Sequence, residues 1–305
     1  MRPRAHRFCF PVLAALALPA AAQTPAPQAQ PETVYSEAQR EKDLSAARWV
    51  IENLLRPSFS LDGQYARWKQ PVCPHVYGLK PLPAWFVEHR IREVAEMVGA
   101  PLDREDPCIP NIGIVLTVDP QASLMSIADK APLLLQGGNQ KLTVKYPVQA
   151  WYASFIDTGY AQKFLDIPWE LVTPPLDGPP FVGGSSSNRL YTNLQPEMAA
   201  ATVLVDSNKV QGMTLGELGD YLAFLTLAQA GQNGECMEAP SIANLMLDKC
   251  AADTRAHSLS RIDLALLSAL YAVPDFPEAL QKQRIVGAIR RDLEKEFVSD
   301  AQSTK

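Results

Sequence analysis

The four cysteines in the body of the chain constrain its fold more than any other feature; they are Cys73, Cys108, Cys236 and Cys250. An even number favours two disulfides in an oxidising compartment. Three pairings are possible, and we favour the local one, Cys73–Cys108 with Cys236–Cys250, because each pair brackets one structural unit. Zinc ligation by these cysteines is the alternative, but the chain lacks the C-x-x-C spacing that such sites use.

The first 22 residues have the pattern of a secretory signal peptide. Three arginines precede an apolar run over residues 8–19, and small residues end at Ala22, so we expect cleavage before Gln23. The apolar run of about a dozen residues is too short to cross a bilayer. The sequence therefore predicts a periplasmic or secreted protein, in which cysteines can oxidise.

The predicted mature chain is acidic. Removing the signal peptide takes away three arginines and no acidic residue, so the formal net charge changes from -5 to -8. A nucleic-acid partner is disfavoured, because phosphate binding needs a basic face. No later segment reaches about 18 uncharged apolar residues, so we expect no membrane span in the mature protein.

The patterning predicts a single domain over residues 36–298, between a disordered Pro/Gln/Ala-rich tether at 23–35 and a flexible tail at 299–305;. Apolar residues at helical spacing predict helices at 36–55, 83–99, 214–230, 259–271 and 276–297. Apolar, β-branched runs predict strands at 111–118, 148–155 and 200–205, and composition predicts a surface loop over 168–193. Together the elements indicate an α+β fold: a small mixed sheet flanked by helices, with a helical C-terminal part.

The helix predicted after the third strand starts with a capping box. Thr214 and Glu217 have the T-x-x-E spacing, in which the two side chains satisfy exposed N–H groups at a helix start;. Asp220 is then a first-turn acid that interacts favourably with the helix dipole. Apolar residues from Leu218 to Ala228 form a stripe at helical spacing. Helix capping together with core packing is one explanation for Glu217 and Asp220.

The same helix resembles the zinc-binding helix of the zincin metalloproteases, whose pattern is H-E-x-x-H, often H-E-L-G-H. Residues 216–220 (GELGD) align with that pattern without a gap. Residues 241–246 (SIANLM) are similar to the segment beneath the zinc in zincins, and residues 259–263 (LSRID) with 267–271 resemble their late helix. The resemblance covers roughly residues 80–275 and implies a zincin-like domain. The chain also resembles uncharacterised secreted proteobacterial proteins of this kind, which implies no activity.

Carried over to this chain, most roles of the zincin site are lost. The zinc-ligand positions hold Gly216, Asp220 and Thr226, and of these only Asp220 has a side chain that commonly binds zinc;. Tight zinc sites need at least three protein ligands, so we expect no metal and no other cofactor. The position of the general base holds Glu217, the single retained element.

Trp151 and Tyr152 are the candidate binding residues, because they lie in the strand predicted nearest to this helix. In zincins an edge strand at that place binds an extended peptide by strand addition. The alternative is that both side chains belong to the core, as aromatic side chains usually do.

The hypothesis from the sequence is an exported pseudo-metalloprotease of the cell envelope, without catalysis, that binds peptide or envelope protein segments or has a structural role. The alternative is a hydrolase that uses the carboxylates of Glu217 and Asp220 without the usual zinc site. A third reading is an unrelated fold in which GELGD occurs by chance.

The disulfide pairing leads to a direct prediction. Mature protein that is unfolded without reductant should contain no free thiol, because all four of its cysteines are oxidised. A colorimetric thiol assay, run before and after reduction, checks this. Four reactive thiols before reduction would refute both disulfides.

Overall fold

The computed structural model describes residues 36–56, 58, 64–102, 107–135, 142–158, 163–166, 194–231, 234–274 and 278–303. The predicted signal peptide, the tether and the loop at 168–193 lie outside the described residues, so these predictions stay untested. From Tyr35 to Lys305 the chain forms one compact unit.

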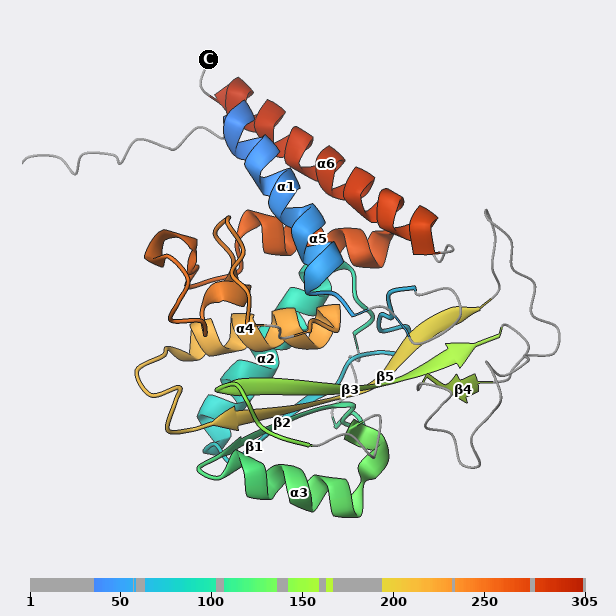
Figure 1. The fold of residues 1–305 in the computed structure, drawn as a ribbon, viewed down its shortest axis with the longest axis vertical. Coiled ribbons are helices and arrows are strands. Elements are labelled where there is room, and N and C mark those ends of the chain that lie inside the picture. Colours follow the sequence, from blue (N-terminus) through green and yellow to red (C-terminus); the bar gives the residue numbers. More distant parts are fainter. Residues whose placement is uncertain are drawn as a thin grey trace, which may run out of the picture. The chain divides into compact units, whose positions relative to one another are not determined.

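Five strands of the described residues form one mixed sheet (Figure 1): β1 (Pro74–Tyr77), β2 (Ile112–Thr117), β3 (Val148–Asp157), β4 (Lys163–Leu165) and β5 (Gln195–Asp206). Their order is β1-β2-β5-β3-β4. β1, β2 and β5 are parallel, whereas β3 is antiparallel to both β5 and β4. β5 is the central strand, and its Val203 pairs with Ile114 on one side and with Ala150 on the other.

Six α-helices of the described residues flank the sheet: α1 (Glu37–Asn53), α2 (Pro81–Val98), α3 (Pro120–Lys130), α4 (Leu215–Ala228), α5 (Arg261–Ala272) and α6 (Glu278–Ser303). α2 and α4 pack together on one face of the sheet, and α3 covers the other (Figure 1). α1, α5 and α6 pack together beyond α4. Short 3-10 helices lie at Pro132–Leu135, Ile242–Asn244 and Ala252–Thr254.

The alternation of side chains along β2 separates two apolar clusters. Ile112 and Ile114 face the main core with α2 and α4. Val115 faces the opposite side, where it packs against the cluster of Leu124 and Leu204 beneath α3. Both faces of the sheet are therefore covered, which explains why the predicted strands read as continuous apolar runs.

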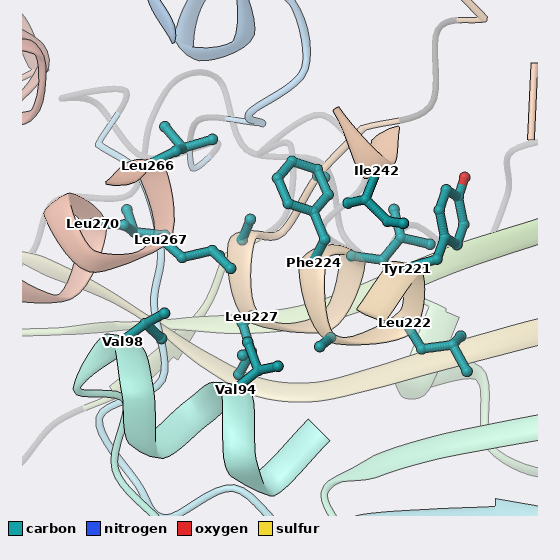
Figure 2. Packing of buried hydrophobic residues seen from close by; sticks show 14 of the residues in the cluster. Val94, Val98, Tyr221, Leu222, Phe224, Leu227, Ile242, Leu266, Leu267 and Leu270 are labelled. Atoms are coloured by element: carbon teal, nitrogen blue, oxygen red, sulfur yellow. The ribbon is translucent and has the colours of Figure 1, made fainter. Parts of the chain in front are cut away.

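Helix α4 lies at the centre of the main core. Every residue from Leu218 to Ala228 is buried. Figure 2 shows Val94 and Val98 of α2 next to Leu227, with leucines of α5 on another side of the helix. Burying one large apolar side chain stabilises a fold by about 1.5–3 kcal/mol, so the packing of this helix supplies a large part of the stability of the domain.

The C-terminal end of α4 leaves carbonyl groups without helical partners. Side chains from three segments far apart in the sequence donate hydrogen bonds to them. These pairs are Trp68 Nε1 with Thr226 O, Tyr271 Oη with Leu227 O and Tyr152 Oη with Leu225 O, each at 2.8 Å. The buried end of the helix is thus satisfied by tertiary contacts.

The predicted local disulfide pairing is confirmed. Cys73 is bonded to Cys108, and Cys236 to Cys250, with Cα–Cα distances of 6.0 and 5.5 Å. Both distances are in the normal range for disulfides. The first bond joins the residue before β1 to the segment before β2, and the second closes a loop between α4 and α5.

The predicted fold class is confirmed, since the described residues form a small mixed sheet flanked by helices. Three elements were not predicted: β1, β4 and α3. β1 and β4 have only four and three residues, too few to show a period;. α3 follows Asp119, whose Oδ1 accepts from Ala122 N at 2.9 Å, so its capping signal was present in the sequence;.

The last helix is longer than expected. α6 continues to Ser303 and so includes much of the segment predicted as a flexible tail. None of the helices in the described part of the chain is long and apolar enough to cross a membrane.

Candidate functional site

The start of α4 has the predicted capping box. Thr214 Oγ1 accepts a hydrogen bond from Glu217 N at 3.1 Å, and Glu217 Oε2 accepts one from Thr214 N at 2.6 Å. Each side chain satisfies a backbone donor that the helix geometry leaves without a partner. The box fixes the position of the Glu217 carboxylate at the first turn.

Asp220 lies in the second turn of α4, where it is buried and held from two directions. Its Oδ1 atom accepts from Arg90 Nε of α2 at 2.6 Å, and its Oδ2 atom accepts from Leu259 N at 3.0 Å. The hydrogen bond with Asp220 raises the pKa of Arg90 above its ordinary value. Asp220 therefore joins α2, α4 and the segment before α5, a role that the helix-dipole interpretation did not foresee.

Gly219 allows this ion pair to form. A Cβ atom at that position would lie 2.9 Å from Arg90 Cγ, closer than side chains approach each other. The glycine that H-E-L-G-H and GELGD share is thus needed here because the aliphatic part of the Arg90 side chain packs directly against it.

The second oxygen of the Glu217 carboxylate contacts Nδ1 of His257. The hydrogen bond from Thr214 N, followed by the contact with His257, lowers the pKa of Glu217 below its ordinary value. The His257 side chain is 74% exposed, whereas that of Glu217 is 15% exposed. Forty residues separate the two, so no spacing in the sequence pairs them.

An open cleft of about 760 Å³ lies beside the start of α4, and Glu217 and His257 are among its lining residues. Its walls come from the carboxyl ends of β2 and β5, the segment before β3, and the residues after the 3-10 helix at 242–244. Ligands of open α/β sheets bind outside the carboxyl ends of parallel strands, so this position suits a ligand. The lining mixes charged and apolar side chains, among them Asp119, Lys145, Asp206, Lys209, Met213 and Met246.

The positions that bind zinc in zincins do not form a ligand set here. Gly216 has no side chain, and Asp220 is paired with Arg90. Thr226 Oγ1 donates to Leu222 O at 2.8 Å inside the core. Within the described residues, no three His, Cys, Asp or Glu side chains come together as metal ligands would.

The segment that resembles the one beneath the zinc in zincins is fixed against α5. Asp263, at the start of α5, accepts from Ser241 Oγ at 2.5 Å and from Ile242 N at 2.9 Å. Ser260 completes a second capping box with the same carboxylate. Burial raises the pKa of Asp263 above its ordinary value, even though these hydrogen bonds act in the opposite direction.

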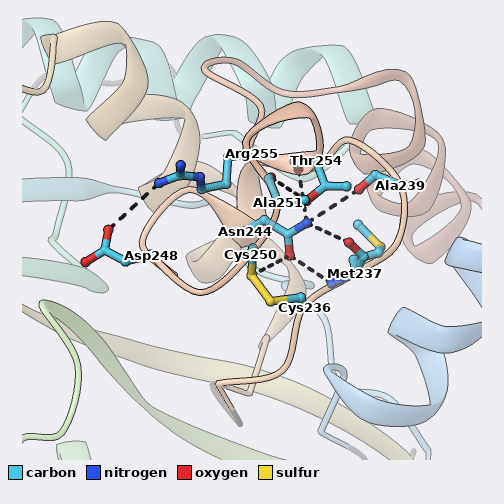
Figure 3. The surroundings of a disulfide bond; sticks show 9 residues. All are labelled: Cys236, Met237, Ala239, Asn244, Asp248, Cys250, Ala251, Thr254 and Arg255. Atoms are coloured by element: carbon cyan, nitrogen blue, oxygen red, sulfur yellow. Dashed lines mark hydrogen bonds and ion pairs between the residues drawn. A yellow bond between two sulfur atoms is a disulfide. The ribbon is translucent and has the colours of Figure 1, made fainter.

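Asn244 holds the loop around the second disulfide (Figure 3). Its Nδ2 donates to Met237 O at 2.9 Å and to Thr254 O at 3.0 Å, and its Oδ1 accepts from Met237 N at 2.9 Å. Cys236 and Cys250 are joined beside it. One buried amide and one disulfide therefore organise the connection from α4 to α5, which forms a wall of the cleft.

The two candidate binding residues lie on opposite faces of the sheet, because neighbours in a strand alternate. Tyr152 is buried on the α4 face, where it donates to Leu225 O. Trp151 is partly buried on the α3 face, against Leu124 and Leu204. On the side away from β5, β4 pairs with β3 only at Phe155–Asp157. The two side chains therefore do not line a common groove.

No protein-family model matches the chain, and neither a curated protein nor a solved structure matches it. The resemblance to zincins is therefore a hypothesis that depends on the residues themselves and on where the fold places them.

The ion pair between Arg90 and Asp220 leads to a stability prediction. Asp220→Ala should lower the free energy of unfolding by about 3 kcal/mol, because it leaves a guanidinium without its buried partner and Leu259 N without an acceptor. Glu93→Gln, which removes the exposed partner of Arg90, should cost less than about 1 kcal/mol;. Urea unfolding at neutral pH measures both. Equal stabilities of Asp220→Ala and wild type would contradict this role.

The capping box leads to a pH prediction. A carboxylate with a lowered pKa in the folded state stabilises the protein above its ordinary pKa of about 4.3, and this contribution is lost as the pH falls through the lower folded value. Glu217→Ala should therefore destabilise the protein by about 1 kcal/mol at pH 7, with a difference that shrinks in acid. The exposed Glu238→Ala is the control. A difference from wild type that stays constant down to the acid limit would count against the charge-dependent cap.

Proposed function

We propose that this chain is an exported protein with a zincin-like domain that does not catalyse hydrolysis. In this proposal the cleft at the start of α4 binds a peptide or a peptide segment of an envelope protein. The observation that carries the proposal is that both carboxylates of GELGD are engaged in structural contacts next to an open cleft.

The contacts of Glu217 and Asp220 support the non-catalytic part of the proposal. Both oxygens of Asp220 accept hydrogen bonds, one of them from a guanidinium. Both oxygens of Glu217 are also in contact, with Thr214 N and with His257. A general base works best with a pKa near the working pH, and the pKa of Glu217 is shifted away from neutrality.

The arrangement of elements supports the zincin-like part. The helix with GELGD follows a sheet strand, packs against the earlier long helix α2, and contacts the 3-10 segment at 242–244. That segment is bound in turn to Asp263 of the late helix α5. α4, the 3-10 segment and α5 are thus connected by direct contacts, which supports this part of the proposal.

The lining of the cleft supports a peptide as the ligand. A peptide in extended conformation needs polar partners for its backbone and apolar surface for its side chains. The cleft offers both, with Lys145 and Asp206 among its polar residues and Leu245 and Met246 among its apolar ones. The two confirmed disulfides support the exported part of the proposal, since they form in oxidising compartments;.

The contact between Glu217 and His257 favours one alternative function. A carboxylate and an imidazole at the wall of a cleft are the groups that hydrolases use as acids and bases. In this alternative, the chain is a hydrolase without the usual zinc site, and Glu217 acts on a substrate in the cleft while Asp220 keeps the helix in place.

Peptide binding tests the proposal. A fluorescently labelled hexapeptide library should bind the mature protein, as measured by fluorescence polarisation. Gln211→Trp, at an exposed lining residue of the cleft, should weaken binding at least about tenfold by filling space at the rim;. Gln283→Trp, at an exposed position on α6, is the matched control and should bind like wild type.

The same library separates the two functions. Mass spectrometry after long incubation should find intact peptides. Cleavage that is lost in Glu217→Gln would favour the hydrolase, and the absence of any binding by the wild type would refute the peptide-binding proposal.

A further inference from the structure

Helix α2 exposes an unusual number of large apolar side chains. Leu82 is 75% exposed, Trp85 and Met97 are each 55% exposed, and Phe86 is 43% exposed. Together with His89 these residues recur at helical spacing, so they lie along one face of the helix; we call this face the α2 stripe. Contiguous exposed apolar surface of this kind marks an interaction site.

The stripe is separate from the face that the fold itself uses. Val87, Ile91, Val94 and Val98 form the buried face of α2 and pack in the main core. The stripe lies on the other side of the helix, so its apolar residues add nothing to the core of their own chain. It is also distinct from the cleft, because no residue of the stripe lines that cleft.

The centre of the stripe is a pair of stacked rings. The rings of Trp85 and His89 are stacked, with centroids 4.8 Å apart and planes 9° apart. Nε2 of His89 lies 3.3 Å from Glu93 Oε1. A tryptophan that is ordered before binding loses little entropy on association, and tryptophan is one of the residues that dominate binding energy at interfaces.

A partner at this surface contacts side chains rather than a strand edge. The neighbouring strand β1 is at the edge of the sheet. Pro74 has no N–H to offer there, and the N–H of Val76 donates to Glu88 Oε1 at 2.7 Å. A proline and an N–H that is already bonded protect an edge strand from pairing with another strand. A partner at this surface therefore contacts the side chains of the α2 stripe.

We propose that the α2 stripe binds the same stripe of a second copy of this chain, with the two helices antiparallel. The argument is the distribution of charge along α2. Exposed Lys80 precedes the helix, and the exposed Glu93 and Glu96 lie in its C-terminal half, where Glu93 also contacts Arg90 and His89 of its own helix. A twofold axis near His89 brings the lysine end of one helix next to the acidic end of the other, and sets Leu82 near Met97 of the second copy.

The size of the surface sets the strength of the dimer. The 18 residues of α2 form a helix about 27 Å long, at about 1.5 Å per residue. One helix face buries less than the roughly 800 Å² per partner of a standard stable interface. The dimer is therefore weak and dissociates on dilution.

Sedimentation velocity of the mature protein tests the proposal, over about 1–300 μM, the range in which small interfaces associate. The wild type should shift from monomer to dimer as its concentration rises. Trp85→Glu should raise the dissociation constant at least about tenfold. Met125→Glu replaces an equally exposed residue on α3 and should leave dimerisation unchanged. Circular dichroism confirms that each variant is folded.

A charge exchange tests the antiparallel arrangement. Lys80→Glu and Glu96→Lys should each weaken the dimer, because each places like charges together across the twofold axis. The double variant restores opposite charges and should regain most of the wild-type affinity. A wild type that stays monomeric at every concentration would overturn the second copy as the occupant. A double variant that is no better than either single variant would overturn the antiparallel register.

Discussion

Helix α4 is buried from Leu218 to Ala228, and the backbone groups at both of its ends are satisfied by side chains of the protein. At its start the Thr214–Glu217 box supplies the partners locally. At its end the donors are Trp68, Tyr152 and Tyr271, which come from a loop, a sheet strand and a later helix. An unsatisfied buried carbonyl costs about 1–3 kcal/mol, so the positions of these three segments are tied to the position of α4.

Three residues of the GELGD segment make contacts that hold α4 in the fold. Gly219 leaves room for Arg90, Asp220 binds it and the backbone of Leu259, and Glu217 caps the helix and contacts His257. Glu217, Gly219 and Asp220 are therefore each accounted for by a contact that stabilises the fold. An open cleft lies beside the start of this helix.

Periodicity and residue spacing in the sequence predicted the features that depend on neighbouring residues. The five predicted helices, the three predicted strands and the capping box at Thr214 follow from periodicity and spacing that act within a few turns;. β1 was missed because four residues are too few to show a period. Trp151 and Tyr152 were expected to share a groove, whereas strand alternation places them on opposite faces of the sheet;.

The sequence alone determined every described α-helix except α3, the strands β2, β3 and β5, and the cap at the start of α4, because each of these depends on residues close together in the chain. Only the tertiary structure decided that Asp220 pairs with Arg90 and that His257 contacts Glu217. It also decided that the hydroxyl of Tyr152 donates to a carbonyl at the C-terminal end of α4 instead of lining a groove. The physical reason is distance along the chain. The partners of Asp220 and Glu217 are 130 and 40 residues away, and only the packing of α2, α4 and α5 brings them together.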